Sequence, residues 1–463
     1  MLRTIKQSEI ELIHEKTLHL LEHVGVVFEH DGIIEEFKKH GIRTDGYLVY
    51  FDRKTVETAV STLKRSFVMK TPFEELKIGE GGIAFSSASG CRKVLRDGSM
   101  YDTTIADYVM TRKLDATSPI INLSSSPLMY VADFPEGKTD LIKAALTLKY
   151  SKHPAIMSCF GKKDAEETIA LARDFYDTDE GYYTIGVGNV ISPLYYNESD
   201  VEAILAYTKR NLPVVIACCS SPGMTSPITL SGTMIQNNAE VLAGVIMTQI
   251  VNPGAPVVYG NTTFTSNMRT AETVSWGPEV DVFIHYAKAM ADFYGLPYRG
   301  GGSLSAAKDL DYENGAETAL SLQATMDAGT DFIFHAFGEL DGLNAFSLEK
   351  YVLDEELLAS MLSVKDRDLF DDELLCIESM EEVGPRGNYL VEEETVEYYQ
   401  EEVFYPTLFN IGAYNAWEAK GKPGVAEKAK AAVEKRLAGY ELPEYSPKQK
   451  KILEDILQGI DEA

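Results

Sequence analysis

The start of the chain carries apolar residues at helical spacing. Over residues 13–24 they recur every three or four positions, on one face of a helix that should end at Gly25. Similar patterns predict two further helices, over residues 32–40 and 55–63. The first sixty residues are therefore expected to be largely helical.

Alternating apolar and polar residues follow this helical part and predict β-strands. The alternation occurs over residues 67–70, 83–87 and 92–95. An Asp97-Gly98 pair comes shortly after the last of these runs and is typical of a tight hairpin turn. We interpret residues 1–102 as an N-terminal cap region of helices and β-hairpins.

From residue 103 onward, short apolar runs alternate with polar turns and amphipathic helices. The runs cover residues 120–123, 155–159, 183–187, 213–218, 256–259, 297–300 and 331–335. Their spacing of roughly 30–40 residues suits strand–turn–helix units. Seven such units favour an α/β fold of the (β/α)8 TIM-barrel type over a doubly wound sheet, which usually has about five or six strands.

The sequence pattern is less regular at the two ends of the barrel segment than in its middle. We place the barrel at residues 103–390 and expect its eighth strand either from residues 374–390 or from the hairpin region. Residues 391–463 are acidic and aromatic, with helical patterns over 392–402 and 405–417. They are expected to form a C-terminal helical extension that packs on the barrel.

Composition narrows the class of protein. The 463 residues carry a net charge of −28, which excludes nucleic acid and anionic membrane surfaces as partners. The N-terminus lacks the apolar core of a signal peptide, and the longest apolar stretch is too short to span a membrane. Five cysteines without a C-x-x-C pair suit reduced thiols. We expect a soluble, cytoplasmic protein, and leave open whether it forms a homo-oligomer.

The carboxyl ends of the strands should form the mouth of the barrel, where active sites lie. In this chain they carry small polar residues and glycines, closely followed by aromatic residues. Small residues leave space, and rings around that space suit a flat apolar or cationic ligand. The pattern therefore predicts a wide cavity at this end.

Two residues at the strand ends stand out. Arg299 is followed by glycines, so its guanidinium could bind a carboxylate with two hydrogen bonds, or form a structural ion pair across the barrel. His335 ends an apolar strand and is either a ligand contact or a core histidine with satisfied hydrogen bonds. The sequence leaves both pairs of alternatives open.

Metal chemistry has little support. His19 and His23 have the spacing of two metal ligands on a helix, but no third ligand is evident. Cys218 and Cys219 could ligate a metal or act as nucleophiles, although buried cysteines at strand ends are more often inert. We expect no tightly bound metal.

Several segments, in order along most of the chain, resemble the trimethylamine methyltransferase superfamily of corrinoid-dependent methyltransferases. The more specific ones are the block from Pro222 to Ala243 and the HAFGELDG block that begins at His335. The others are LHLLEHVGVVFEH, SSASGCRKVLRDG, PIINLSSSP, GAPVVYGNTT, PYRGGGSLSAAK and VFYPTLFNIGAYNAWEAKG. Founding members carry pyrrolysine, whereas this chain has only standard residues. It is therefore similar to the non-pyrrolysine branch, which acts on quaternary amines.

The resemblance implies methyl transfer from a quaternary amine to the Co(I) corrinoid of a partner protein. Glycine betaine, proline betaine, carnitine and γ-butyrobetaine are the candidate substrates. A quaternary nitrogen already carries the positive charge that lets a neutral amine leave, so the cofactor supplies the nucleophile and the protein supplies position and electrostatics. The corrinoid should arrive on the partner protein.

The resemblance also implies roles for individual residues. Arg299 and His335 would hold the substrate carboxylate, and aromatic rings would surround the trimethylammonium group. Asn261 would also contact the substrate. Glu339 or Asp341 would supply a counter-charge, and Glu339 is the one candidate for a catalytic role. The rings are Phe264, Tyr298, Phe334, Phe337 and Phe346. The candidate cofactor contacts are Gly188, Asn189, Ser220, Gly300 and Gly301.

Two other functions remain open at this point. A metal-dependent barrel lyase or hydrolase would require zinc on Cys218, Cys219 or His335. A non-enzymatic protein that binds quaternary amines would use the same mouth without turnover. Metal analysis of the purified protein distinguishes the metal-dependent enzyme from a methyltransferase. Methylation of Co(I) cobalamin by a betaine distinguishes a methyltransferase from the binding protein.

Overall fold

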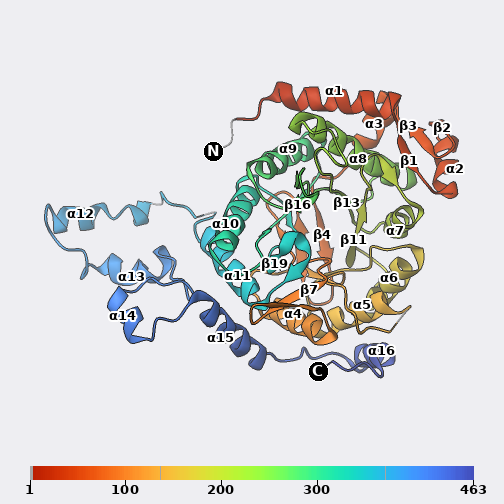
Figure 1. Cartoon of the computed structure of the whole chain (residues 1–463). Helices are drawn as coiled ribbons and strands as arrows, with labels where there is room; N and C mark the ends of the chain where they lie inside the picture. The colour runs from red at the N-terminus through yellow and green to blue at the C-terminus, as the bar shows by residue number, and fades with distance from the viewer. Residues whose placement is uncertain (1–3, 136, 366, 371, 463) are drawn as a thin grey trace.

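A closed ring of parallel strands lies at the centre of the computed structural model, which describes residues 4–135, 137–365, 367–370 and 372–462 (Figure 1). Its eight strands lie in the order β6-β18-β17-β14-β13-β11-β10-β9. In chain order they are β6 (Ala84–Phe85), β9 (Ser124–Ser125), β10 (Ala155–Ile156), β11 (Thr184–Asn189), β13 (Val214–Cys218), β14 (Val257–Asn261), β17 (Tyr298–Gly300) and β18 (Phe332–Ile333). The predicted barrel is confirmed, and each of the seven apolar runs forms or leads directly into one strand.

The ring closes between β6 and the segment that leads into β9. The backbone N–H groups of Asn122 and Leu123 both donate to the carbonyl of Phe85, at 3.2 and 3.1 Å. The side chain of Asn122 accepts from the N–H of Phe85 at 2.8 Å and donates to the carbonyl of Ile83 at 2.9 Å. One asparagine therefore satisfies the backbone of β6 on both sides of Ala84.

The eighth strand comes from the hairpin region, one of the two sources that the sequence allowed. The alternative prediction, a strand within residues 374–390, is wrong. This segment forms the end of the short helix η2 (Asp372–Leu375) and helix α12 (Ile377–Val383), outside the barrel. Since β6 lies within residues 1–102, the first segment of the chain contributes a barrel strand. The division at 102/103 and 390/391 stays a prediction.

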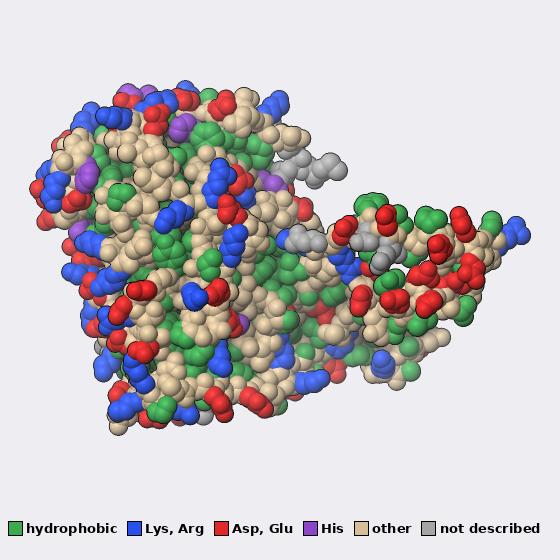
Figure 2. Space-filling model, turned by 180° about the vertical axis from the view of Figure 1, so that it is seen from behind, with side chains coloured by type: hydrophobic (Ala, Val, Ile, Leu, Met, Phe, Trp, Pro, Cys, Tyr) green, Lys and Arg blue, Asp and Glu red, His purple; other side chains and the backbone are tan. Residues whose placement is uncertain are grey.

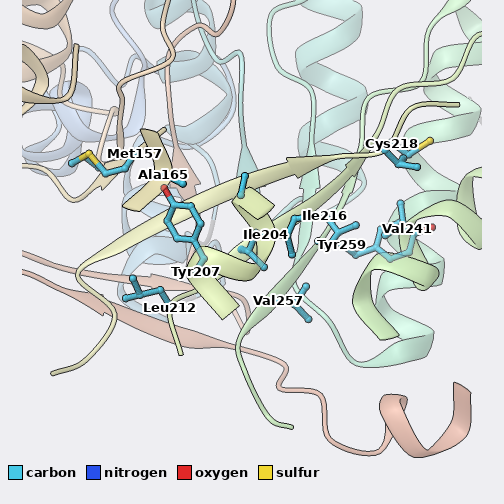
Figure 3. Packing of buried hydrophobic residues seen from close by; sticks show 14 of the residues in the cluster. Met157, Ala165, Ile204, Tyr207, Leu212, Ile216, Cys218, Val241, Val257 and Tyr259 are labelled. Atoms are coloured by element: carbon cyan, nitrogen blue, oxygen red, sulfur yellow. The ribbon is translucent and has the colours of Figure 1, made fainter. Parts of the chain in front are cut away.

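Helices surround the strands. They are α4 (Ile105–Thr117), α5 (Thr139–Tyr150), α6 (Lys162–Tyr176), α7 (Glu198–Thr208), α8 (Leu230–Val251), α9 (Pro278–Tyr294), α10 (Tyr312–Asp327) and α11 (Leu348–Leu362). Their apolar faces and the outward side chains of the strands form one large core; Figure 3 shows part of it, with Ile204, Tyr207 and Ile216. A second core fills the barrel itself with residues such as Ile156, Val215 and Phe332.

The N-terminal region covers one side and the bottom of the barrel. The bottom is covered by the hairpin β4 (Phe67–Lys70) and β5 (Glu75–Ile78), whose apolar residues join the core inside the barrel. The side is covered by α1 (Gln7–His23), which packs on α8, and by α2 (Asp31–Lys39) and α3 (Arg53–Val60). The three predicted N-terminal helices are thus confirmed. A small sheet joins this region to the barrel through β1 (Val26–Phe28), β2 (Arg43–Asp45), β3 (Leu48–Tyr50) and β12 (Tyr195–Tyr196).

A second small sheet lies beside the mouth. It combines the hairpin β7 (Lys93–Arg96) and β8 (Ser99–Asp102) with β19 (Glu339–Leu340) and β20 (Ala345–Phe346), which follow the last barrel strand. The predicted Asp97-Gly98 turn joins β7 to β8, and both residues have the positive φ that such a turn requires. The remaining strands, β15 (Thr265–Asn267) and β16 (Glu272–Val274), form a hairpin after β14.

The C-terminal segment is divided between the barrel wall and a projection. Helix α15 (Val425–Ala438) packs against α4 and α11, and α16 (Pro447–Leu457) packs against α5 and α6. In contrast, α12, α13 (Glu393–Glu402) and α14 (Tyr414–Ala419) extend sideways away from the barrel (Figure 1). The helix expected over 405–417 is wrong over most of its length, because it begins only at Tyr414, after Pro406 and Gly412.

The length and hydropathy of each helix show whether it could span a membrane. Within the described residues, no helix is both long enough and apolar enough to cross a bilayer.

Loss of the Asn122 side chain should destabilise the barrel. The Asn122→Ala variant loses two hydrogen bonds to β6 and leaves backbone groups unpaired, which should cost about 2–3 kcal/mol of unfolding free energy. Urea unfolding measures this loss. Asn344→Ala, which removes an exposed amide bonded to Asp341, is the control and should change stability by less than about 0.5 kcal/mol. Equal effects of the two substitutions would contradict the role of Asn122 in closure.

Candidate active site at the mouth of the barrel

A cavity of about 180 Å³ lies at the carboxyl ends of the barrel strands. Three aromatic rings (Phe160, Phe264 and Phe334) line it together with the polar side chains of Asn189, Cys219, Thr262, Arg299 and His335. The cavity is narrower than the wide space that the small residues at the strand ends predicted, because these rings occupy much of the mouth. An aromatic wall and one guanidinium are its main chemical features.

Three side chains form a hydrogen-bonded line in this wall. Arg299 Nη2 lies 2.7 Å from His335 Nε2, and His335 Nδ1 lies 2.9 Å from Glu339 Oε1. A guanidinium can only donate, so His335 Nε2 must accept and the ring proton must reside on Nδ1, which donates to Glu339. A neutral imidazole therefore links a buried cation to a buried carboxylate.

The backbone holds this line in place. His335 has a φ of +68°, a left-handed conformation that turns the chain sharply after β18. Its carbonyl accepts from the N–H of Ser303 at 2.9 Å, and a Cβ on Gly302 would lie 2.2 Å from that carbonyl oxygen. Glycine at position 302 therefore permits the close approach of the two segments that carry Arg299 and His335. Glu339 is held separately, by the N–H of Ser89 at 3.0 Å.

A buried ion pair supports the same two segments from behind. Asp354 accepts from the N–H of Gly338 at 2.8 Å and from Ser303 Oγ at 2.7 Å, and Lys350 Nζ lies 2.6 Å from it. Neither residue stands out in the sequence, because an i,i+4 Lys–Asp pair on a helix is typical of an exposed face. Both are buried here. Their burial, which only the folded structure shows, is what distinguishes them from a surface pair.

The environment of Arg299 is unusual for a charged group. Its side chain is almost fully buried, with 4% of its surface exposed, and its Cζ lies 5.0 Å from the centre of the Phe334 ring. Burial lowers the pKa of the guanidinium to about 10. Its Nε is buried without a hydrogen-bond partner in the described part of the chain. An anion in the cavity would supply the missing acceptor.

The structure brings part of the predicted site together. Of the predicted residues, Asn189, Phe264, Phe334, Arg299 and His335 line the cavity. Glu339 stands behind His335. Asp341 lies at the surface, where Lys308 Nζ is 2.6 Å from it.

The other predicted residues face away from the cavity. Tyr298, Phe337 and Phe346 belong to the outer core between strands and helices. The Ser220 hydroxyl is bonded to Asn237, and Asn261 accepts from the N–H of Thr263 at 3.0 Å. Cβ atoms built on Gly188, Gly300 and Gly301 would contact Ile204, Tyr298 and Leu304. Gly188, Asn261, Tyr298 and Gly300 lie within barrel strands, where the register of the folded barrel decides whether a position faces inward or outward. Phe160, which the prediction omitted, faces the cavity, and its place directly after a strand was the available signal.

The two adjacent cysteines do not form a metal site with His335. The Cys218 thiol donates to Glu240 at 2.8 Å, and burial raises its pKa well above the usual value. Cys219 opens into the cavity, and the surrounding protein raises its thiol pKa to about 11. Among the described residues, no three His, Cys, Asp or Glu side chains are grouped so that they could hold a metal ion.

Comparison with known proteins identifies the family. The sequence model for trimethylamine methyltransferase matches residues 1–459. The chain belongs to the trimethylamine methyltransferase family. A solved structure titled as the monomethylamine methyltransferase of Methanosarcina barkeri is similar in fold, with a TM-score of 0.53 at 10% sequence identity, over 96% of this chain and 89% of that one.

Three relatives within the family are similar over almost their whole length. The glycine betaine methyltransferase of Desulfitobacterium hafniense is 32% identical over 450 residues, 96% of this chain and 94% of that protein. The proline betaine:corrinoid methyltransferase of Eubacterium limosum is 31% identical over 97% of this chain and 96% of its own length. The L-carnitine:corrinoid methyltransferase of the same organism is 29% identical, with 96% and 95% covered.

The proton on His335 provides a direct test of this geometry. Because Arg299 can only donate, ¹⁵N NMR of histidine-labelled protein should show Nδ1 protonated and Nε2 unprotonated at neutral pH. The signal pair that disappears in His335→Gln assigns the residue. An imidazole protonated on Nε2 would contradict the line from Arg299 to Glu339.

Proposed function

We propose that this protein transfers a methyl group from a small betaine to the Co(I) corrinoid of a partner protein. The observation that carries the proposal is the buried Arg299, with an unpartnered Nε beside an aromatic cavity at the barrel mouth. The similarity to methyltransferases of glycine betaine, proline betaine and carnitine supports it. Five free cysteines support a reducing, cytoplasmic location.

Arg299 binds the carboxylate of the substrate in this proposal. A buried guanidinium without an acceptor gains more from an anion than an exposed one, because no water competes for its N–H groups. The line through His335 to Glu339 fixes the orientation of the guanidinium before the substrate arrives. The position of the betaine carboxylate is thereby fixed, which limits where the methyl groups at the other end can lie.

The rings of Phe160, Phe264 and Phe334 surround the trimethylammonium end. This group has no N–H to donate, so aromatic faces are its natural partners, at about 0.5–2 kcal/mol each. They also exclude water, which strengthens every charge interaction in the cavity. Recognition then needs no carboxylate beside the nitrogen, in keeping with the positions of Glu339 and Asp341 away from the cavity.

The absence of a free acid in the cavity wall favours a quaternary nitrogen. Among the described lining residues, the His335 proton is donated to Glu339, and the thiols of Cys218 and Cys219 have raised pKa values. Loss of a methyl group from a quaternary nitrogen leaves a neutral tertiary amine that needs no proton. The wall of this cavity suits that reaction, since it positions the substrate without supplying an acid.

The residues beyond the cavity fit a corrin ring. A Cβ on Gly223 would contact Ile228 and Met268, so these two exposed side chains lie together on loops after β13 and β14. These two side chains form an apolar patch that suits the face of a flat macrocycle, while the exposed Phe160 ring and Asn189 line the cavity itself. The reduced corrinoid supplies the nucleophile that takes the methyl group. The protein's part is to hold and orient the substrate in the cavity.

Short betaines should be the preferred substrates. The cavity of about 180 Å³ is little larger than the one of about 150 Å³ that holds benzene in another protein. Glycine betaine fits such a volume better than carnitine or γ-butyrobetaine. We expect methylation of free Co(I) cobalamin, followed by its absorbance, with glycine betaine or proline betaine and not with trimethylamine. Binding of betaines without any methylation would instead indicate a binding protein, and efficient turnover of trimethylamine would contradict the proposal.

Removal of Arg299 should weaken substrate binding selectively. A charge-assisted hydrogen bond contributes about 1.5–3 kcal/mol, so Arg299→Ala should raise the dissociation constant of the preferred betaine by about tenfold to a few hundredfold. Arg299→Lys should recover only part, because an ammonium lacks the planar pair of donors. Calorimetry measures both.

Choline is the matched control ligand, since it has the trimethylammonium group without the carboxylate. Its binding should change little in Arg299→Ala. Equal losses for choline and betaine, or a lowered unfolding temperature with betaine binding intact, would assign Arg299 a structural role instead.

A further inference from the structure

The side-chain amide of Asn237, on α8, joins two of the loops that surround the cavity. Its Nδ2 donates to the hydroxyl of Thr263, in the loop after β14, at 2.5 Å. Its Oδ1 accepts from the hydroxyl of Ser220, in the loop after β13. All three side chains are buried, so that water does not compete for these hydrogen bonds. One amide thus connects the two loops.

Each of the two contacts lies one residue away from the cavity. Thr263 directly precedes Phe264, which lines the cavity although only 4% of its surface is exposed. Ser220 directly follows Cys219, which lines the cavity as well. Because neighbouring residues share a peptide unit, a shift of either hydroxyl moves a side chain of the cavity wall. The amide of Asn237 therefore fixes part of that wall.

Glu240 holds the same part of α8 to the ends of the strands. It lies about one turn after Asn237 and is fully buried. Its carboxylate accepts from the Cys218 thiol at 2.8 Å, from the Ser192 hydroxyl at 2.7 Å and from the Leu194 N–H at 2.9 Å. The loop after β11 is thereby tied to α8 as well. Helix α8 is a rigid base from which Asn237 holds its two loops.

The wall that Asn237 supports is distinct from the wall that carries the guanidinium. Arg299 and His335 come from β17 and from the end of β18, whereas Phe264 and Cys219 follow β14 and β13. In the proposed function, the Phe264 ring faces the trimethylammonium group. A cation is attracted to a ring when it lies over its face, within about 6 Å of the ring centre. A displaced ring would therefore weaken this contact.

We propose that Asn237 is a positioning residue for the trimethylammonium end of the substrate. Asn237 does not itself line the cavity; it fixes Phe264 in the place where the ring can face the cation. The inference rests on the proposed function, because it takes a quaternary amine as the occupant of the cavity. It concerns the end of the ligand opposite to the carboxylate that Arg299 binds.

The next residue along the chain provides a matched control. Asn238 is also buried, but its side chain lies on a different side of α8. There it contacts Thr17, Tyr259 and Tyr294 at 2.8–3.0 Å. Helix α1 packs on α8, and charged and histidine side chains cover the surface at this edge of the molecule (Figures 1 and 2). Asn238→Ala therefore removes buried amide hydrogen bonds without touching the loops around the cavity.

Binding of glycine betaine and of choline, measured by calorimetry, tests the proposal. Asn237→Ala should raise the dissociation constants of both ligands by the same factor, about three- to thirtyfold, because both carry the trimethylammonium group. Thr263→Val keeps the shape of the side chain but removes the hydroxyl, and should reproduce this effect. Asn238→Ala should change neither constant.

A double-mutant cycle with Phe264→Ala separates positioning from a general loss of structure. If Asn237 acts through Phe264, then Asn237→Ala should have little further effect on choline binding once the ring is absent. Additive losses, an equal loss in Asn238→Ala, or unchanged binding in both Asn237→Ala and Thr263→Val would each overturn the role of Asn237. A wild-type protein that binds neither ligand would contradict the proposed function and, with it, this inference.

The position of the ring can also be followed without a ligand. In protein labelled with 4-fluorophenylalanine, the ¹⁹F signal that disappears in Phe264→Ala belongs to this ring. It should shift or broaden in Asn237→Ala and stay unchanged in Asn238→Ala. An unchanged signal in Asn237→Ala would overturn the role of Asn237 whether or not the protein methylates a corrinoid, so the two failures remain distinct.

Discussion

The arrangement of the barrel mouth depends on keeping one guanidinium charged while it is buried. Removing the charge of Arg299 from water is costly, and its lowered pKa reflects that cost. The structure offsets it through the neutral His335, which connects the cation to Glu339, and through the face of Phe334. An incoming carboxylate would complete the compensation. In the proposed function, the carboxylate of a betaine supplies the hydrogen-bond acceptor that Arg299 lacks.

Several distant features serve this one requirement. Gly302 lets the segment after β17 approach the carbonyl of His335, and the left-handed backbone of His335 turns its ring toward Arg299. The pair of Lys350 and Asp354 ties both segments to α11. Such a buried network has a fixed geometry because its hydrogen bonds join specific partners. In the proposed function, the precision of substrate positioning follows from this network.

The sequence was informative where a repeating pattern exists. Seven barrel strands, the three N-terminal helices and the hairpin at Asp97-Gly98 follow from apolar spacing and turn chemistry. The eighth strand has only two residues, Ala84 and Phe85, and its closure depends on Asn122 from another segment, so no local pattern could choose between its two possible sources. In the loop from Phe334 to Phe346 the side chains follow no period, which is why Phe334 faces the cavity while Phe337 and Phe346 face the outer core.

The central claim is that a charged Arg299 holds the substrate carboxylate, and the pH dependence of binding tests it most directly. Glycine betaine affinity should be constant from neutral pH to about 9, then weaken by about tenfold per unit above about 10, as the free guanidinium loses its proton. Choline affinity, measured by calorimetry on the same protein, should not show this loss. A parallel decline for both ligands, or a betaine affinity that stays constant through pH 11, would contradict the account.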